Sequence, residues 1–511
     1  MKVSEMAYKA LSNVLGPDYV TSDPAIMQAY AGGQIGYKSI HRSPDCVVLP
    51  KDTEEVQAIY RLANQYEFCV IPVGTNLFPT CVPSDEGYII IDPKRMDKII
   101  EIDEKNMYAV VEPYVTFFQL QTETMKVGLT SYVSGAGSQI SVMANLLFQG
   151  SGFQSYRLGQ SNRSWLAMEW VLPDGEIWKT GSASIEGGYF WGEGPGPVMK
   201  NLVKGWCGMF GGIGMCTKIG IKLHPWAGPP IFPVKGVVHK KVHLPKNKFK
   251  IVGISFPSLQ TAIDAMYEIG KAEIGSQVVL IDALLLAAEL SESKDDFWKL
   301  WESGMYKKVV GYKTIFVILQ GYASDKQLIY EEKVLKHIYT KLGGKLLPPI
   351  LRILLDRVFL AENIRAIHTT RIMRPAGCFI SVKEAEGSLD HAVKTVEASK
   401  ELVLRRLKRK KTMENYLGVW INAMDFCHYC HCEPFIVFHW GKAEIDALAL
   451  AVELKLEDIK AKRYNELPIV PQSMLDSEYG NLGLYVGKIK KEFDPNNVAN
   501  PPWPLGSFGG I

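Results

Sequence analysis

One stretch of six residues brings together five side chains that can bind a transition metal. It reads Cys427-His428-Tyr429-Cys430-His431-Cys432, and thiolates and imidazoles are common ligands of zinc and iron. His428 and His431 are three residues apart, so in a regular strand they face opposite sides. They would need a turn or bulge at Tyr429-Cys430 to bind one metal. The alternative is a strand whose cysteines are buried as small hydrophobic residues and whose histidines face a pocket.

A second group of reactive side chains is cationic. Arg365, His368, Arg371 and Arg374 fall within one short stretch of the sequence. A guanidinium group can bind a carboxylate through two parallel hydrogen bonds, or it can stabilise a phenolate. The alternative for each arginine is a solvated, salt-bridged position. We expect Arg371 or Arg374 to contact a substrate.

Three clusters of small residues could surround a phosphate or a flat ring. They read Val73-Gly74-Thr75-Asn76, Ser134-Gly135-Ala136-Gly137 and Gln149-Gly150-Ser151-Gly152. Glycine and alanine let backbone N–H groups come close to such a ligand, where a larger side chain would block the approach. The clusters therefore predict a cofactor cradle, with Gly74 and Gly150 at positions where a side chain would collide with the cofactor or force a strained φ.

The elements around these clusters can be predicted from periodicity and turn residues. A strand at 46–50, a helix at 54–66 with Thr53 as its N-cap, and a strand at 68–71 form a β-α-β unit that ends in the first cluster. Residues 166–172 alternate in polarity and precede Pro173-Asp174-Gly175-Glu176. Proline presets φ and glycine accepts positive φ, so this segment predicts a β-hairpin.

A cluster of prolines at 225–230 predicts a domain boundary, because proline ends regular structure. Beyond it we expect strands at 251–256, 278–281 and 314–319 with helices between them, one of which spans 259–270. This order indicates a second, α+β domain. The chain is expected to close with a helix at 484–493.

The composition is that of a soluble globular protein. The 511 residues suffice for two or three domains, and a net charge of +3 gives no strong field that favours nucleic acid. The N-terminus lacks the apolar core of a secretion signal, and charges interrupt the apolar segment at 348–360, so we expect no membrane span. Nine cysteines without an export signal favour reduced thiols in the cytoplasm.

The order and spacing of the loops resemble the flavoproteins of the vanillyl-alcohol oxidase and p-cresol methylhydroxylase superfamily, including its D-lactate and glycolate dehydrogenase branch. The resemblance covers nearly the whole chain and implies an α+β fold. An FAD-binding domain of two subdomains would span 1–228. An α+β cap domain with an antiparallel sheet would span 229–465, and a C-terminal segment, 466–511, would return to the FAD domain.

The resemblance also implies which residues contact FAD. The first loop would bind the pyrophosphate, the second loop and the helix after it would line the flavin, and a later glycine segment would contact the ADP half through its backbone. The implied contacts are Pro72, Val73, Gly74, Thr75, Asn76, Leu77, Ser134, Gly135, Ala136, Gly137, Val142, Met143, Ala144, Asn145, Gln149, Gly150, Gly212, Ile213, Gly214, Met215 and Cys216.

Three departures from the family pattern bear on the chemistry. Met143-Ala144 stands where relatives commonly carry two glycines, which leaves less room at the flavin. The first loop contains no histidine, so we expect FAD to bind without a covalent link. The glutamate-histidine-glycine motif of the lactate branch is Glu478-Tyr479-Gly480 here, so the family's catalytic histidine is absent or is replaced by Tyr479.

In the lactate branch, histidines of a late strand and a glutamate bind a metal beside the flavin. By similarity, His428, His431 and Glu478 are the expected ligands if this chain binds a divalent transition metal. The resemblance implies His431 and Tyr479 as catalytic residues, with Arg371 and Arg374 for the substrate.

Together these features predict an FAD-dependent oxidoreductase, a dehydrogenase rather than an oxidase. It would transfer a hydride from a 2-hydroxy acid to flavin and then pass the electrons to a protein acceptor, and we expect a homo-oligomer. One alternative is oxidation or hydroxylation of a phenolic or alkyl-aromatic substrate, and another is a flavin-binding subunit that only relays electrons. Candidates for an aromatic pocket are Tyr189, Phe190, Trp191, Trp298, Trp301, Trp420 and Trp440.

Overall fold

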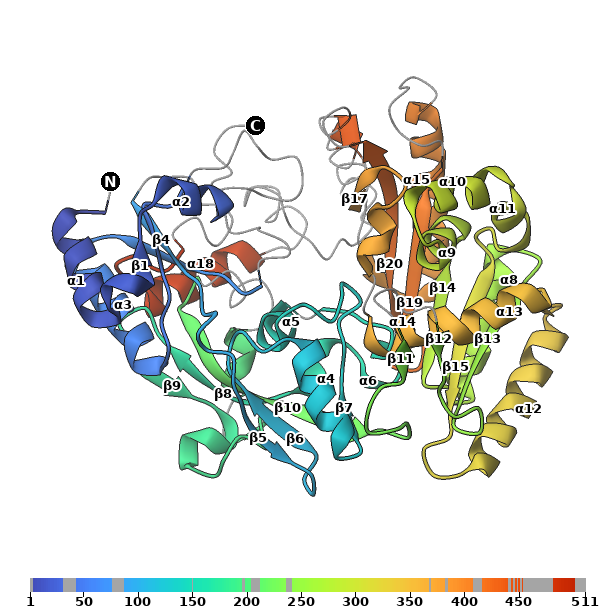
Figure 1. Cartoon of the computed structure of the whole chain (residues 1–511), viewed down its shortest axis with the longest axis horizontal. Coiled ribbons are helices and arrows are strands. Elements are labelled where there is room, and N and C mark those ends of the chain that lie inside the picture. Colours follow the sequence, from blue (N-terminus) through green and yellow to red (C-terminus); the bar gives the residue numbers. More distant parts are fainter. Residues whose placement is uncertain are drawn as a thin grey trace.

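The computed structural model shows the chain as two lobes (Figure 1). One lobe contains the N-terminal half and the helix α18 (Leu482–Phe493), and the other, the cap, contains the strands and helices from β13 (Phe249–Ser255) to β20 (Tyr429–His439). The structure describes residues 3–30, 43–75, 87–148, 150–194, 198–203, 212–235, 241–366, 369–381, 385–407, 416–439, 443, 446–447, 449–450, 453 and 481–500.

The first sheet of the N-terminal lobe has the order β1-β2-β4-β3. Its strands are β1 (Val20–Thr21), β2 (Cys46–Val48), β3 (Cys69–Pro72) and β4 (Tyr88–Ile91). The last three are parallel, as the predicted β-α-β unit requires. The helices beside this sheet are α1 (Glu5–Leu15), η1 (Pro17–Tyr19), α2 (Pro24–Tyr30) and α3 (Thr53–Tyr66).

The predicted N-cap of α3 was wrong by one residue. Asp52 caps the helix by accepting a hydrogen bond from the backbone N–H of Glu55. Thr53 is the first helical residue, and its hydroxyl donates to Glu169 Oε1 at 2.8 Å. The reason is a tertiary contact, because the threonine side chain is engaged by a carboxylate that lies 116 residues away in the sequence.

The second sheet of this lobe has the order β5-β6-β10-β8-β9, and β7 pairs with β10. Its strands are β5 (Ile99–Asp103), β6 (Tyr108–Val111), β7 (Leu129–Ser131), β8 (Trp165–Val171), β9 (Ile177–Lys179) and β10 (Met215–Pro225). The predicted hairpin is confirmed, because β8 and β9 pair across the turn at Pro173 to Glu176 and Gly175 has φ +85°. The other helices are α4 (Phe117–Lys126), α5 (Val142–Phe148), α6 (Ser155–Leu158), η2 (Ser161–Ser164), η3 (Gly181–Ile185) and η4 (Met199–Leu202).

The end of the described chain returns to the N-terminal lobe. Ala499 forms a parallel bridge to Val70 of β3, and Asn500 N donates to the carbonyl of Val70 at 2.9 Å. Lys490 of α18 is buried and donates to the carbonyl of Gly212 at 2.6 Å and to Asp494. Residues 481–500 therefore belong to the N-terminal lobe, whereas the exact domain limits at 228 and 465 stay a prediction.

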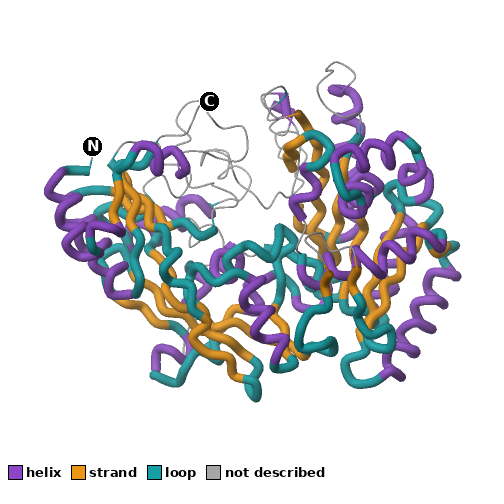
Figure 2. Tube along the Cα trace, in the orientation of Figure 1, coloured by secondary structure: helices purple, strands orange, loops and turns teal. Residues whose placement is uncertain are grey.

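The cap is built on an antiparallel sheet of eight strands with the order β16-β13-β15-β14-β19-β20-β17, and β18 pairs with β20. This confirms the predicted α+β cap. Its further strands are β14 (Gln277–Ile281), β15 (Thr314–Gln320), β16 (Lys345–Leu346), β17 (Gly377–Ser381), β18 (Ala385–Gly387) and β19 (Gly418–Met424), and β11 (Val234–Lys235) pairs with β12 (Lys241–Val242). Figure 2 shows these strands side by side with helices packed around them.

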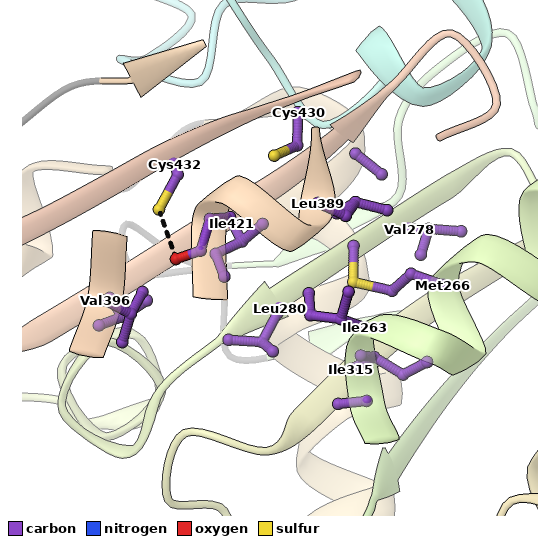
Figure 3. Packing of buried hydrophobic residues seen from close by; sticks show 14 of the residues in the cluster. Ile263, Met266, Val278, Leu280, Ile315, Leu389, Val396, Ile421, Cys430 and Cys432 are labelled. Carbon is purple, nitrogen blue, oxygen red and sulfur yellow. Dashed lines mark hydrogen bonds between the residues drawn. The ribbon is translucent and has the colours of Figure 1, made fainter. Parts of the chain in front are cut away.

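Each face of the cap sheet has its own apolar core. The helices α8 (Leu259–Lys271), α12 (Asp325–Lys341) and α15 (Leu389–Leu407) cover one face, where Ile263 and Met266 of α8 pack against Val278, Leu280 and Ile315 (Figure 3). On the other face lie α9 (Ala283–Leu290), α10 (Lys294–Glu302), α11 (Met305–Val309), α13 (Pro349–Leu354), η5 (Leu355–Phe359), α14 (Leu360–Arg365) and η6 (Thr369–Met373). None of the described helices is both long enough and apolar enough to cross a membrane.

A polar cavity of about 50 Å³ lies between the two lobes. Its lining includes Ser131, Arg157 and His224 from the N-terminal lobe and Gln277, Gln320 and Tyr322 from the cap. Ser131 Oγ, His224 Nε2 and Gln277 Oε1 are buried and have no hydrogen-bond partner among the described residues. A cavity of this size and polarity has room for water, so we expect ordered water to complete these hydrogen bonds.

This cavity predicts an acid-sensitive contact between the lobes. Burial lowers the pKa of His224 to about 4, and the charges of Lys222 and Arg157 add to the shift. In the unfolded chain His224 binds a proton as the pH falls below about 6.5, whereas in the folded chain it binds one only near pH 4. The free energy of unfolding therefore decreases as the pH falls from 6.5 towards 4. At pH 5 we expect His224 to lower the free energy of unfolding by about 2 kcal/mol.

The measurement compares denaturant unfolding at pH 7.5 and pH 5 for the natural chain and for His224→Gln. The variant is expected to lose less stability on acidification, by about the 2 kcal/mol given above. His337→Gln on α12 is the matched control, because it makes the same substitution at an exposed histidine. Equal pH dependence of His224→Gln and the natural chain would contradict the prediction.

Candidate active site

The first predicted cofactor loop lies against the start of α5. Thr75 Oγ1 accepts a hydrogen bond from the backbone N–H of Ser141 at 3.2 Å. A Cβ atom added to Gly74 would lie 3.2 Å from the Cβ of Ala144 on α5, which is closer than most carbon contacts. The described part of this loop, Pro72 to Thr75, and the residues Val142, Met143 and Ala144 are thus neighbours, as the resemblance implied. Asn76 and Leu77 lie outside the described residues.

The second and third small-residue clusters pack against each other. The backbone N–H of Gly135 donates to the carbonyl of Ser151 at 2.8 Å. Asn145 of α5 joins the two clusters, because its Nδ2 donates to Ser134 Oγ at 3.0 Å and its carbonyl accepts from the N–H of Gly150 at 3.1 Å. Any side chain at Gly150 would collide with the Asn145 amide, so this glycine is required by a protein contact rather than by a positive φ.

Two further glycines in these clusters have clear steric reasons. Gly137 adopts φ +124°, a backbone conformation that L side chains rarely adopt. A side chain at Gly152 would collide with the carbonyl oxygen of Val133, which is a backbone atom and cannot move aside by a rotamer change. Ala136 follows Gly135 in the same loop and donates its N–H to Ser134 Oγ at 3.2 Å. Gln149 lies outside the described residues.

The last predicted loop is held by β8 and by the C-terminal segment. Ile213 accepts a hydrogen bond from Trp170 Nε1 at 2.8 Å, and Gly212 accepts from Lys490. Gly214 has φ +107°, and a side chain there would collide with the carbonyl of Val171. Met215 and Cys216 begin β10 and are buried. The described contacts therefore explain the shape of this segment, and its contact with a cofactor stays a prediction.

In the cap, the side chains of the Cys-His-Tyr-Cys-His-Cys segment that lie in β20 alternate between the two faces of the sheet. β19 and β20 pair in antiparallel register, with Asn422 opposite His431 and Ile421 opposite Cys432. Cys430 and Cys432 point into the core beneath α8 and α15 (Figure 3). Because successive residues of a strand point to opposite faces, His431 and Asn422 share the other face.

That other face meets the small-residue loops. A Cβ atom on Gly135 would lie 2.6 Å from the ring of Trp420, and the Trp420 and Phe153 ring centroids are 5.8 Å apart. Asn422 Nδ2 donates to the carbonyl of Gly152 at 2.6 Å. The strand face that carries His431 is thereby fixed directly beside the predicted flavin loops.

His431 is the described side chain of this face that is best suited to proton transfer. It is buried, and its Nε2 lies 3.4 Å from Glu433 Oε2. The other oxygen of Glu433 accepts a hydrogen bond from the Ser381 hydroxyl. The Trp420 ring meets the imidazole edge to face at 5.2 Å between centroids. A carboxylate that orients an imidazole is an arrangement in which the imidazole can accept a proton from a bound molecule.

Residues 44–181 match the family described as FAD binding domain. The chain is 30% identical over 229 residues to the 4-cresol dehydrogenase (hydroxylating) flavoprotein subunit of Pseudomonas putida, covering 43% of this chain and 42% of that protein. It is 25% identical over 292 residues to a probable mitochondrial D-lactate dehydrogenase of Danio rerio, covering 56% of this chain and 52% of that protein.

Among solved structures, substrate-bound p-cresol methylhydroxylase has a TM-score of 0.76 at 19% identity and covers 100% of this chain and 99% of that chain. Residues 44–181 thus match an FAD-binding domain, and the whole chain shares the fold of p-cresol methylhydroxylase, as the resemblance to the vanillyl-alcohol oxidase and p-cresol methylhydroxylase superfamily implies.

These similarities leave the substrate open. The matched segments span about half of these curated relatives or less, and the solved structures are so distant in sequence that they establish only the fold. Alkyldihydroxyacetonephosphate synthase has the same fold, with a TM-score of 0.70 at 16% identity over 98% of this chain and 85% of that chain. One fold thus carries several reactions, and the chemistry must be argued from the site.

The residues around the loops fit the FAD that the superfamily binds. Small residues at 134–137 and 150–152 leave the backbone accessible to a flat ring. Asn145 is buried between the two clusters, and its Oδ1 has no hydrogen-bond partner among the described residues. An unpaired buried acceptor is unfavourable in the free protein and is satisfied when a ligand brings an N–H or O–H group.

The described residues do not support the predicted metal site. His428 lies exposed in the turn before β20, where Asp425, Phe426 and Cys427 adopt left-handed φ values, whereas His431 is buried on the strand. Among the described residues, no group of three or more histidine, cysteine, aspartate or glutamate side chains could hold a metal. Glu478, like the catalytic candidate Tyr479, lies outside them. The turn ends before Tyr429, so the two histidines lie in different elements, and a site that also includes Glu478 stays a prediction.

The arginines make contacts with the protein itself. Arg371 donates to the carbonyl of Glu289, and Arg374 donates to the carbonyls of Ala288 and Ser291 at the end of α9. Cations at a helix C-terminus stabilise its unpaired carbonyls. Arg365 lies over the Phe118 ring, and burial lowers its pKa to about 10. These contacts give each of the three arginines a structural role. The carboxylate clamp by Arg371 or Arg374 stays a prediction. His368 lies outside the described residues.

The aromatic candidates divide between the lobes. Phe190 packs 6.4 Å from Tyr108 in the N-terminal lobe and is half exposed, as is Trp191 beside it. Trp298 and Trp301 belong to α10 of the cap, and Trp420 alone of the described candidates meets the small-residue loops. Trp440 lies outside the described residues. Sequence reasoning listed Trp420 among many aromatics and did not single out Asn422 or Glu433, although alternation with His431 could have indicated both.

Proposed function

We propose that the protein is an FAD-dependent dehydrogenase of a small aromatic substrate, of the alkyl-phenol class. The observation that carries the proposal is the cap face beside the flavin loops, where the Trp420 ring lies against Gly135, 5.8 Å from the Phe153 ring and 5.2 Å from the His431 imidazole between centroids. Aromatic rings recognise a flat substrate by stacking and edge contacts. Arg371 and Arg374, the predicted carboxylate clamp for a 2-hydroxy acid, donate to the Glu289 and Ser291 carbonyls at the end of α9.

The chain would contribute positioning and proton transfer. FAD, when bound, accepts the hydride that leaves the substrate. Trp420 would hold the substrate ring, and His431 would accept the proton of the substrate hydroxyl at Nδ1, because its Nε2 faces Glu433. Glu433 would orient the imidazole and stabilise its protonated form, because it lies 3.4 Å away and is itself fixed by Ser381. The low exposure of His431 would keep water from competing for the proton.

A 2-hydroxy acid is the second candidate substrate. It is supported by the similarity to the probable D-lactate dehydrogenase and by 27% identity over 187 residues to the glycolate oxidase subunit of Bacillus subtilis. In this reading the same imidazole would accept the hydroxyl proton, and the carboxylate would require a cation that the described face does not offer. We infer a protein as the electron acceptor from the resemblance to the dehydrogenase branch, and rapid peroxide formation with substrate and air would contradict that inference.

An oxygen-free bleaching experiment tests the function. Purified protein is mixed with 4-alkylphenols and, separately, with D-2-hydroxy acids, and the absorption of oxidised flavin is followed. We expect the phenols to bleach the flavin and the hydroxy acids to leave it unchanged. Bleaching by hydroxy acids alone would replace the first candidate by the second. No bleaching by either class, in protein whose flavin a chemical reductant does bleach, would favour an electron-relay subunit.

FAD is expected to bind without a covalent link. The reason is the first loop, which contains no histidine. Acid precipitation of the purified protein should leave the yellow flavin in the supernatant. A yellow pellet would contradict this expectation and would direct peptide mapping to nucleophilic side chains near the loops, beginning with His431.

A further inference from the structure

Asn422 of β19 is buried completely at the junction of the two lobes. Its Nδ2 donates to the carbonyl of Gly152 at 2.6 Å. The Gly152 carbonyl can only accept a hydrogen bond, so the amide nitrogen must face it and Oδ1 must point away. This orientation is therefore fixed by chemistry and not by a choice of amide rotamer.

The Oδ1 of Asn422 has no hydrogen-bond partner among the residues that the structure describes. A buried acceptor without a donor is unfavourable, and native proteins rarely retain one without a reason. Water or a ligand must supply the donor. The position of the atom decides which ligand is relevant, because Asn422 lies opposite His431 in the strand register and contacts one of the small-residue loops.

A second unpaired group lies two residues away on the same strand face. Trp420 Nε1 is a buried donor without an acceptor in the described part of the chain, and its ring lies against Gly135. The face therefore carries one unpaired acceptor and one unpaired donor on residues two positions apart in the strand. A carbonyl beside an N–H group, as in the imide edge of a flavin ring, matches this pair, and so does a hydroxyl group of a substrate.

We propose that Asn422 is a ligand-binding residue of the active site whose Oδ1 accepts a hydrogen bond from an N–H or O–H group. Its Nδ2 at the same time ties the cap sheet to the loop at Gly152. The donor is the flavin ring or the substrate hydroxyl, and the substrate alternative rests on the proposed function. The flavin alternative does not, because it is measured without any substrate.

The test uses Asn422→Leu, which keeps the shape of the side chain and removes both polar ends. Asn363→Leu is the matched control. Asn363 of α14 is 2% exposed, donates its Nδ2 to the Phe359 carbonyl at 2.8 Å and also has an unpaired Oδ1 among the described residues. It carries the same hydrogen-bond pattern and has no described contact with the loops at 134–137 or 150–152.

Two readouts separate the two sources of the donor. If the flavin is the donor, flavin release from the Asn422→Leu holoenzyme during ultrafiltration should be at least tenfold faster, with a shifted flavin absorption spectrum. If the substrate is the donor, flavin release should be unchanged and KM should rise at least tenfold with kcat less affected. Asn363→Leu should change neither property, although it should lower the melting temperature by a similar amount.

The proposal is overturned if Asn422→Leu and Asn363→Leu lower the melting temperature alike while flavin release, flavin spectrum and KM stay within twofold of the natural chain. If Asn422→Leu does not fold, Asn422→Thr takes its place. Threonine suits a strand, keeps a hydroxyl donor for Gly152 and removes the carbonyl acceptor. The same tenfold effects are expected of it, and their absence in folded protein also overturns the proposal.

Discussion

Gly152→Ala is expected to yield protein that retains less than a tenth of its flavin and is less stable by about 3 kcal/mol. The added methyl group would collide with the carbonyl of Val133 and would come within 3.2 Å of the backbone nitrogen of Gly135. Both obstacles are backbone atoms, so neither can move aside by changing a rotamer. The loops at 134–137 and 150–152 would separate, and the hydrogen bond from Asn422 would be lost with them.

Flavin content is measured from the ratio of visible to protein absorbance, and stability from thermal unfolding. Gly487→Ala is the control, because Gly487 lies in α18 with open space around its Cβ position. Alanine in an open helical position should stabilise the protein by up to about 1 kcal/mol. Full flavin content in Gly152→Ala would show that these loops do not form the cradle.

His431→Asn is expected to lower turnover by about two to four orders of magnitude while flavin content stays near that of the natural chain. Asparagine fills much of the imidazole volume but cannot accept a proton at neutral pH. The residue is buried beside Glu433 and Trp420, so its removal should act on the chemical step more than on the cradle. Turnover is measured with the substrate that bleaches the flavin, and flavin content and melting temperature are measured on the same samples.

His428→Asn is the matched control in the same segment. His428 lies three residues earlier and is exposed in the turn, so the same substitution should leave turnover within about twofold. Glu433→Gln should reproduce part of the His431→Asn effect, because an amide orients the imidazole but does not stabilise its charge. Equal losses in His428→Asn and His431→Asn would contradict the assigned role, and so would loss of flavin in His431→Asn.

The sequence alone determined the parts of this protein that follow from local rules. Pro173 and Gly175 fixed the β8–β9 hairpin because one presets φ and the other accepts positive φ. The periodicity of residues 53–66 determined α3, and the small-residue clusters indicated the segments that come together in the N-terminal lobe. The alternation within the Cys-His-Tyr-Cys-His-Cys segment already contained the structural alternative to a metal site, since residues of opposite parity in a strand face opposite sides.

Only the tertiary structure decided which partner each of these groups meets. The choice of Asp52 over Thr53 as N-cap depends on Glu169, and the role of Arg374 depends on the end of α9. The sequence could not show which face of β20 packs beneath α8 and α15 and which face reaches the small-residue loops, although that choice makes His431 a candidate base and the cysteines core residues. Such contacts join residues more than fifty positions apart, and they are fixed by the packing of whole sheets rather than by local preference.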